Sequence, residues 1–306
     1  MNAIEGDHLV KSFGTVAAVK DVTIRVEEKA VFGFLGPNGA GKTTTIRMLT
    51  GVLTPDSGSV RICGVDIQKD PLEAKMMMGV IPENGTVYSD LTAEQNILWT
   101  AKCYGMDGPS RNMRAREILS RLGLTGRKDD VVRTFSKGMR QRISIACAIV
   151  HSPPVLLLDE PTTGLDVYSR RLVIDTIRHM NESGSTILLT THNIEEANAL
   201  CSHISIINRG SIVAGGSPEK LKSTFDISKY VEISFEGAVT PSFFETDEHG
   251  RAENWGDKWR VYTDDPDLTI KRVVSRAGQQ NVRILSIATS APSLEEAFVR
   301  LTGSET

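Results

Sequence analysis

The sequence predicts an α/β protein with a mostly parallel core sheet flanked by helices, and three observations carry that prediction. Apolar runs of strand length alternate with helical patterns along most of the chain. One of these runs, VLLLDEP, is apolar enough for a strand that is buried on both faces. A glycine-rich stretch, GPNGAGKTT, stands between another apolar run and a helical pattern, where α/β proteins bind phosphates.

Length and composition limit the class of protein and the number of domains that the chain can form. The 306 residues are 40% apolar and 24% charged, which is typical of a globular protein with room for two domains. The net charge of −3 does not require a nucleic-acid partner. No apolar run reaches the roughly 18 residues of a membrane span, so we expect no direct membrane insertion and a cytoplasmic location. The cysteines form no CxxC pair, and we expect all four to be buried apolar residues: Cys63, Cys103, Cys147 and Cys201.

The N-terminal part of the chain predicts strands and turns. Residues 7–65 include VAAVKDVTIRV, which alternates as a half-buried strand does, and we expect an antiparallel β part here. The run AVFGFLG then enters the glycine loop. A helix follows in KTTTIRMLTGV and ends at Gly51.

The middle of the chain predicts an inserted helical subdomain at about 84–150, after a strand in KMMMGVIPE. Thr92 and Gln95 have the spacing of a capping box, and Arg111–Leu122 is amphipathic. Beyond it, VLLLDEP predicts a strand, and a helix, a strand and a helix follow at Tyr168–Met180, Thr186–Thr190 and Ile194–Leu200.

A change in the sequence pattern divides the chain into two predicted domains, residues 1–225 and residues 226–306. The second contains the short strand-like pieces YVEISFEG, KWRVYT and VRILSIA, and a helical pattern in SLEEAFVRLTG. We therefore expect a small C-terminal α+β accessory domain.

The stretch GPNGAGKTT fits the phosphate-binding pattern G-x-x-x-x-G-K-[ST] in the strand-to-helix context that this pattern requires. Its glycines let backbone N–H groups face phosphates, Lys42 supplies a mobile cation, and the Thr43 hydroxyl can bind Mg²⁺. Alone, the motif would equally suit a GTPase or a small-molecule kinase. The predicted nucleotide-binding residues are Gly36, Pro37, Asn38, Gly39, Ala40, Gly41, Lys42, Thr43 and Thr44.

Residues at the ends of two further predicted strands are candidates for metal binding and catalysis. Asp159 ends the buried run VLLLDEP and can hold the Mg²⁺ shell, while Glu160 is placed to orient or deprotonate a water beside the γ-phosphate. His192 ends the neighbouring strand pattern LLTTHN, at the edge where open α/β sheets bind ligands. We expect Glu160 and His192 to be catalytic.

The stretch FSKGMRQR predicts a second helix start that is able to bind an anion. A single nucleotide site does not need this second phosphate-binding element. Over residues 1–225, the order and spacing of the motifs resemble the ATP-binding-cassette (ABC) ATPases, a branch of the P-loop NTPases. The matching motifs are KSFG, GPNGAGKTT, FSKGMRQR, VLLLDEP, TTGLD and TTHN.

The resemblance implies a head-to-tail dimer, either a homodimer or a heterodimer with a related ATPase, which holds two ATP molecules between its subunits. Ser136, Lys137, Gly138 and Asp166 would then bind the ATP that is held by the partner's phosphate loop. Phe13 would stack on adenine; without the family, a core phenylalanine at a strand end is the alternative.

Two departures from the family pattern concern charge. The glutamine expected in the lid loop is Glu83, which keeps an oxygen ligand for Mg²⁺ but adds a negative charge, so the implied metal ligands are Thr43, Glu83 and Asp159. Lys137 replaces the first glycine of the signature motif; it would either add a cation near the partner's γ-phosphate or point to solvent.

We expect an ATPase subunit that powers a separate integral membrane permease, lies on the inner face of the cell membrane through that permease, and acts in export. Residues 83–110 would contact the permease, with Tyr88 or Trp99 as exposed anchors; core packing is the alternative for Trp99. The rival is a soluble ABC ATPase acting on ribosomes or nucleic acid, which the single cassette and the net-acidic tail disfavour. A non-hydrolysing regulator is disfavoured by Glu160 and His192, and the motifs carry no information on the substrate.

Overall fold

The computed structural model describes the chain except for residues 84, 86, 225–229, 245–250, 291–293 and 303–306. The described chain forms two compact units: Met1–Pro218 together with Leu301–Thr306, and Glu219–Arg300. The predicted boundary between residues 225 and 226 lies outside the described residues and stays a prediction.

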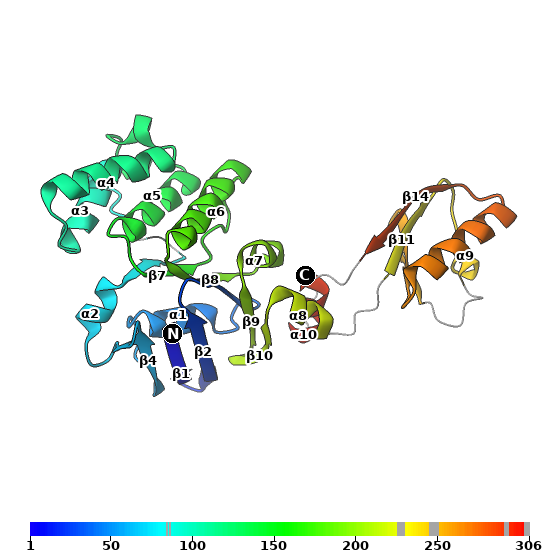
Figure 1. Ribbon diagram of the computed structural model, residues 1–306, viewed down its shortest axis with the longest axis horizontal. Helices are drawn as coiled ribbons and strands as arrows, with labels where there is room; N and C mark the ends of the chain where they lie inside the picture. Colours follow the sequence, from blue (N-terminus) through cyan, green and yellow to red (C-terminus); the bar gives the residue numbers. More distant parts are fainter. Residues whose placement is uncertain (84, 86, 225–229, 245–250, 291–293, 303–306) are drawn as a thin grey trace. The chain divides into compact units, whose positions relative to one another are not determined.

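An antiparallel sheet begins the first unit, as the alternating pattern predicts (Figure 1). Its strands lie in the order β2-β1-β4-β5. Alternate residues of the two long strands are buried, which is why the hydrophobic residues recur with a period of two. The strands are β1 (Asn2–Phe13), β2 (Val16–Glu27), β4 (Ser57–Ile62) and β5 (Val65–Asp66).

The second sheet of this unit has the order β10-β9-β3-β8-β7-β6, and all its neighbouring strands are parallel except the edge pair β9 and β10. Every residue of β3, β7 and β8 is buried. The sequences of β3 and β7 are accordingly mostly apolar, whereas β8 contains three threonines. The six strands are β3 (Val31–Leu35), β6 (Met78–Ile81), β7 (Val155–Asp159), β8 (Thr186–Thr191), β9 (His203–Asn208) and β10 (Ser211–Gly216).

Helices connect these strands, and three of them gather to one side of the unit, α3, α4 and α5 (Figure 1). The predicted capping box at the start of α3 is confirmed: the Thr92 hydroxyl accepts the Gln95 N–H at 3.1 Å, and the Gln95 side chain accepts the Thr92 N–H at 2.9 Å. The helices are α1 (Lys42–Leu49), α2 (Pro71–Met76), α3 (Ala93–Cys103), α4 (Gly108–Arg121), α5 (Lys137–Ile149), α6 (Val167–Glu182), α7 (Ile194–Leu200) and α8 (Pro218–Thr224), with 3-10 turns η1 (Thr125–Arg127) and η2 (Val132–Thr134).

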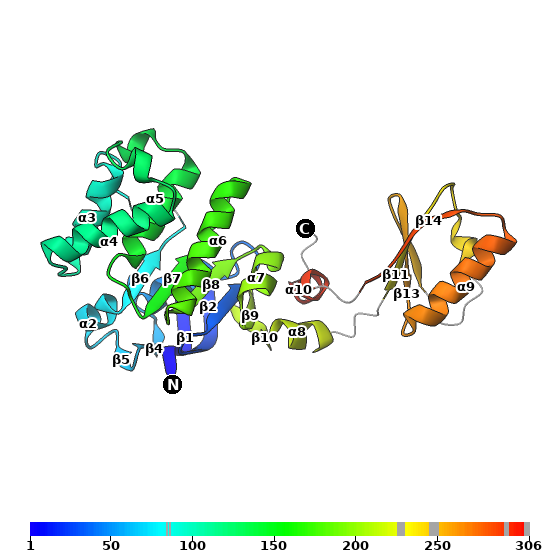
Figure 2. The same cartoon turned by 45° about the horizontal axis from the view of Figure 1, so that its top comes forward.

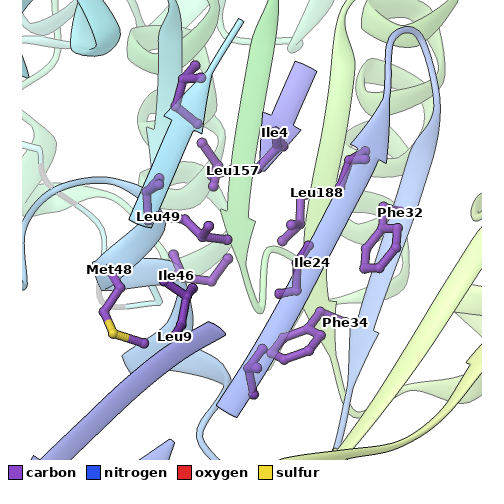
Figure 3. Packing of buried hydrophobic residues seen from close by; sticks show 14 of the residues in the cluster. Ile4, Leu9, Ile24, Phe32, Phe34, Ile46, Met48, Leu49, Leu157 and Leu188 are labelled. Carbon is purple, nitrogen blue, oxygen red and sulfur yellow. The ribbon is translucent and has the colours of Figure 1, made fainter. Parts of the chain in front are cut away.

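Helix α1 lies in the core between the two sheets (Figure 3). Its residues Ile46, Met48 and Leu49 join one buried cluster with side chains from β1, β2, β3, β7 and β8. Because α1 begins at the glycine loop, this packing fixes the position of the loop against the parallel sheet.

The second unit is a four-stranded antiparallel sheet in the order β12-β13-β11-β14, with α9 along one face (Figure 2). The predicted strands are present, whereas β12 and the 14-residue α9 were not predicted. The elements are β11 (Tyr230–Phe235), η3 (Pro241–Phe243), β12 (Ala252–Trp255), β13 (Lys258–Tyr262), α9 (Pro266–Gln279) and β14 (Ile284–Ser290), and α10 (Leu294–Thr302) follows.

The expectation that all four cysteines are buried is wrong for two of them. Cys147 and Cys201 are buried, but Cys63 and Cys103 are exposed. Cys63 lies in the turn between β4 and β5 with a φ of 47°, and Cys103 ends α3. Both positions are at the ends of elements, where the core does not cover them.

We expect Leu49→Ala to destabilise the first unit by about 2–5 kcal/mol, because the buried side chain would leave a cavity between the sheets. Thermal denaturation should show a midpoint lowered by roughly 2–4 °C for each kcal/mol. Val52→Ala is the control, since Val52 is exposed shortly after the same helix. Equal shifts for the two variants would contradict this account of the core.

Candidate functional site

The glycine loop between β3 and α1 is held in place by close backbone packing. A Cβ atom on Gly36 would lie 2.4 Å from the Ile207 carbonyl oxygen, and one on Gly41 would lie 2.6 Å from the Ala18 carbonyl oxygen. Gly41 is also the N-cap of α1, has a φ of 114°, and offers no side-chain cap. The first N–H groups of α1 therefore have no side-chain cap partner, as a phosphate-binding helix start requires.

Lys42 is buried, and its ammonium group stays within the loop. Its Nζ donates to the carbonyl oxygens of Gly36 at 2.6 Å and Pro37 at 3.2 Å. It also lies 3.5 Å from Glu160 Oε1, and both side chains are only 7% exposed. The loop thus carries a buried cation at the place where phosphate charge would be neutralised.

Thr190 of β8 holds the two acidic residues at the end of β7. Its hydroxyl donates to Asp159 Oδ1 at 2.6 Å, and the Glu160 N–H donates to the Thr190 hydroxyl at 3.0 Å and its carbonyl oxygen at 3.2 Å. Glu160 has a φ of 51°, in the left-handed region that non-glycine residues rarely adopt. The pair is therefore fixed by the neighbouring strand.

The carboxylate of Glu160 is the centre of a cluster of polar groups. Glu160 Oε2 accepts the Thr163 hydroxyl at 2.8 Å and lies 2.8 Å from His192 Nδ1, while Oε1 faces Lys42. The His192 side chain is 54% exposed, whereas Glu160 is buried. The structure therefore brings together Lys42, Glu160 and His192, which come from three distant parts of the sequence.

A pocket of about 410 Å³ opens over these groups. Its walls combine the glycine loop, the start of α1, the Glu160 cluster and Glu83 from the loop after β6. The lining residues are Ala18, Asn38, Gly39, Gly41, Lys42, Thr43, Thr44, Glu83, Glu160, Thr163 and His192.

A second pocket of about 500 Å³ is bordered by all three predicted metal ligands, Thr43, Glu83 and Asp159. Their hydroxyl and carboxylate oxygens suit Mg²⁺, which takes few protein ligands and completes its shell with water and phosphate. Among the described residues there is no group of three or more His, Cys, Asp or Glu that could hold a metal ion alone. The donor set fits an ion that arrives with a phosphate ligand.

Phe13 is exposed at the end of β1, where it pairs with Val16 in the β1–β2 hairpin. Its side chain is 52% exposed, and the Lys11 ammonium lies 6.0 Å from its ring centroid. The alternative of a core phenylalanine is therefore excluded.

The signature stretch lies at the start of α5, as predicted. Ser136 is its N-cap and accepts the Met139 N–H at 3.2 Å. Gly138 is buried, and a Cβ there would meet the Ser169 hydroxyl at 2.5 Å and Asp166 Oδ2 at 3.1 Å. The described lining of the 410 Å³ pocket contains none of Ser136, Lys137, Gly138 and Asp166, so these four residues form a separate group.

Two side chains of that group contact their own chain. The Lys137 ammonium lies against Gly164, 2.4 Å from where a Cβ would stand. Asp166 caps α6 by accepting the Ser169 N–H and hydroxyl, each at 2.8 Å, and these hydrogen bonds lower the pKa of the Asp166 carboxyl. Neither the prediction that Lys137 points to solvent nor its alternative anticipated the contact with Gly164.

Sequence reasoning missed three polar residues of the site: Thr163, Thr190 and Glu196. Thr190 stands two residues before His192, and the adjacency of two parallel strands would have placed it beside Asp159. The hydroxyl bonds of Thr163 and the contacts of Glu196 depend on loop geometry that no local pattern signals.

Known proteins similar to this chain are ATP-binding components of transporters. The family model described as ABC transporter matches residues 19–163. The linearmycin resistance ATP-binding protein LnrL of Bacillus subtilis (strain 168) is 32% identical over 98% of each chain. The Nod factor export ATP-binding protein I of Paraburkholderia xenovorans (strain LB400) is 36% identical over 99% of this chain and 98% of its own length.

Solved structures agree with the fold. An ATP-binding subunit of an ABC transporter superposes with a TM-score of 0.69 at 29% identity, over 73% of this chain and 93% of its own. A dimeric ATP-binding cassette in a post-hydrolysis state bound to ADP and Pi superposes with a TM-score of 0.65 at 24% identity, over 70% and 98%. The predicted fold class is confirmed by these likenesses.

We expect Gly41→Ala to abolish phosphate binding in the 410 Å³ pocket, because its Cβ would force the loop away from Ala18. Gly39→Ala is the matched control: Gly39 also has positive φ, but no atom lies within 4 Å of an added Cβ. Calorimetric titration with a nucleoside triphosphate checks this. Equal loss of nucleotide binding in both variants would mean that backbone strain, and not the close approach of Gly41 to Ala18, determines the conformation of the loop.

Proposed function

This chain belongs to the ABC transporter family of ATP-binding proteins and is an ATPase, and from that premise we propose that it powers export through a separate membrane permease. The family resemblance inferred from the sequence motifs is confirmed. The similar proteins are named for antibiotic resistance and Nod factor export, which supports export over import and over the ribosome- or nucleic-acid-acting rival. The observation that carries the catalytic part is the Glu160 carboxylate, held 2.8 Å from His192 beside the glycine loop.

Within this proposal, the glycine loop Gly36–Thr44 binds the ATP phosphates and exposed Phe13 stacks on adenine. Lys42 exchanges its contacts with the loop carbonyls for phosphate oxygens. Thr43, Asp159 and Glu83 hold Mg²⁺, which supplies charge neutralisation at the phosphates when bound. Glu83 adds a negative charge beside ATP where the family pattern has glutamine, and we expect it to weaken binding of the nucleotide at low Mg²⁺.

Glu160 is the proposed general base. Its carboxylate faces the pocket, and it can accept a proton from a water placed for attack on the γ-phosphate. His192 and Thr163 both contact Oε2, which leaves Oε1 for that water once Lys42 has moved to phosphate. His192 orients the carboxylate, and it also lines the pocket in which the phosphates would bind.

A second copy of the chain, or a related ATPase, completes the site in this proposal. Ser136 and Lys137 are exposed at the start of α5 and lie outside the pocket of their own chain. A helix start adds N–H groups and a hydroxyl to phosphate charge that one subunit leaves partly uncovered. A solved ATP-binding cassette of similar fold is dimeric, which supports a dimer.

We assign the permease contact to residues 83–110, apart from residues 84 and 86, which lie outside the described chain. Tyr88 and Trp99 are 57% and 50% exposed, which favours anchors over core packing. Among the described residues no helix is long and apolar enough to cross a membrane. In this proposal the permease attaches the chain to the inner face of the cell membrane.

Glu160→Gln should retain ATP binding and lose turnover by at least about 100-fold, because the amide cannot take a proton from water. Phosphate release and size-exclusion chromatography with ATP are the measurements, and we expect the variant to accumulate as an ATP-bound dimer. Glu195→Gln, an exposed glutamate on α7, is the matched control. Normal hydrolysis by Glu160→Gln would remove Glu160 as the general base.

Ser136→Arg should stop hydrolysis while the isolated chain still binds ATP through its glycine loop. The longer cationic side chain blocks approach of the partner's nucleotide but lies outside the pocket of its own subunit. Fluorescent-nucleotide binding and phosphate release separate the two effects, with Ser120→Arg on α4 as the control. Loss of nucleotide binding by the monomeric variant would show that the signature stretch acts on its own chain's ATP.

A further inference from the structure

A buried hydrogen bond joins the loop after Glu160 to the helix after His192. The Thr162 hydroxyl donates to Glu196 Oε2 at 2.5 Å, and both residues are buried. Thr162 stands two residues after Glu160, and Glu196 stands four residues after His192. The bond therefore connects the two backbone segments that carry the catalytic pair.

These contacts close a ring around the catalytic pair. The Asn193 side chain caps α7 by accepting the Glu196 N–H at 3.0 Å, and Asn193 directly follows His192. On the other side, the Glu160 carboxylate contacts His192 at 2.8 Å. The ring runs from Glu160 to His192, through Asn193 and Glu196, and back through Thr162.

Arg170 of α6 offsets the charge of the buried carboxylate. Its Nε lies 3.4 Å from Glu196 Oε1, while Thr162 occupies Oε2. Arg170 Nε and Glu196 Oε1 form no hydrogen bond, so Arg170 compensates the charge by proximity, while the Thr162 hydroxyl makes the hydrogen bond to the carboxylate. Glu196 thereby links three segments: the loop after Glu160, α6 and α7.

We propose that Glu196 is a positioning residue that holds Glu160 and His192 at hydrogen-bonding distance through Thr162. This inference rests on the proposed role of Glu160 as the general base. Loss of the Thr162 hydroxyl would free the loop after Glu160 to shift relative to His192, and small shifts of a reacting group reduce the rate of the chemical step more than binding. Neither Thr162 nor Glu196 lines the 410 Å³ pocket, so nucleotide binding should survive.

A purely local role for Glu196 is the competing explanation. A carboxylate in the first turn of α7 also interacts favourably with the helix dipole. Thr162→Val separates the two, because it removes the donor to Glu196 and leaves the carboxylate in α7 untouched. Thr162→Ser restores a hydroxyl at the same place.

The experiment compares kcat and KM for ATP in the full chain with its ATPase activity intact. We expect Thr162→Val to lower kcat about tenfold with KM and nucleotide affinity changed less than about twofold, and Thr162→Ser to recover most of the loss. In the double variant with Glu196→Gln, the two losses should be far from additive. Thr186→Val is the matched control, since Thr186 is also buried and hydrogen-bonded but begins β8, at the opposite end of that strand from His192.

The inference would be overturned by wild-type kcat in Thr162→Val, by additive losses in the double variant, or by no recovery in Thr162→Ser. A variant that loses nucleotide binding and thermal stability together would also overturn it, since the bond would then be only structural. Glu160→Gln distinguishes this failure from failure of the proposed function. If Glu160→Gln is inactive while Thr162→Val is normal, only the role of Glu196 is wrong.

Discussion

The parallel register of β3, β8 and β7 is the constraint on which the rest of the first unit depends. Leu35 pairs with Thr191 and Asp159 pairs with Thr190, so all three strands end at one edge. The glycine loop, the Asp159–Glu160 pair and His192 therefore lie side by side, although they are far apart in the sequence. A slip of one residue would turn each of these side chains to the opposite face of the sheet. Complete burial of the three strands makes such a slip unfavourable.

Buried charged groups are concentrated at the same edge of the sheet, and their desolvation lowers the stability of the fold. Lys42, Asp159 and Glu160 are all buried, and their contacts with one another, with Thr190 and with other nearby polar groups offset their desolvation. The left-handed backbone conformation of Glu160 also opposes the stability of the fold. The core beneath the site, where α1 packs between two sheets, therefore supports these polar contacts. A ligand that brings negative charge to Lys42 would stabilise the folded state further through binding linkage.

Local patterns predicted the parts of this protein whose chemistry is contained in short stretches. The glycine loop, the Asp159–Glu160 pair and the α3 capping box each depend on residues a few positions apart, so their signals lie in the sequence itself. The contacts that escaped prediction join distant segments: Thr190 with Asp159, Thr162 with Glu196, and Lys137 with Gly164. Helix α9 had a local signal that was overlooked, since Asp265 caps it and Pro266 begins it.

The contact between Lys137 and Gly164 bears on how two sites in a dimer would communicate. Gly164 lies in the loop that begins at Glu160 and ends at Asp166, and its φ of 70° and missing Cβ make room for the lysine. Gly138 packs against Ser169 and Asp166 at the far end of the same loop. The signature helix therefore touches this loop at two points, while Thr162 and Thr163 connect it to Glu196 and Glu160. In a head-to-tail dimer, a phosphate bound at Ser136 from the partner would act on a segment already joined to the chain's own Glu160 carboxylate. The departure from glycine at Lys137 thus adds a contact within the subunit, whatever it contributes to the shared nucleotide.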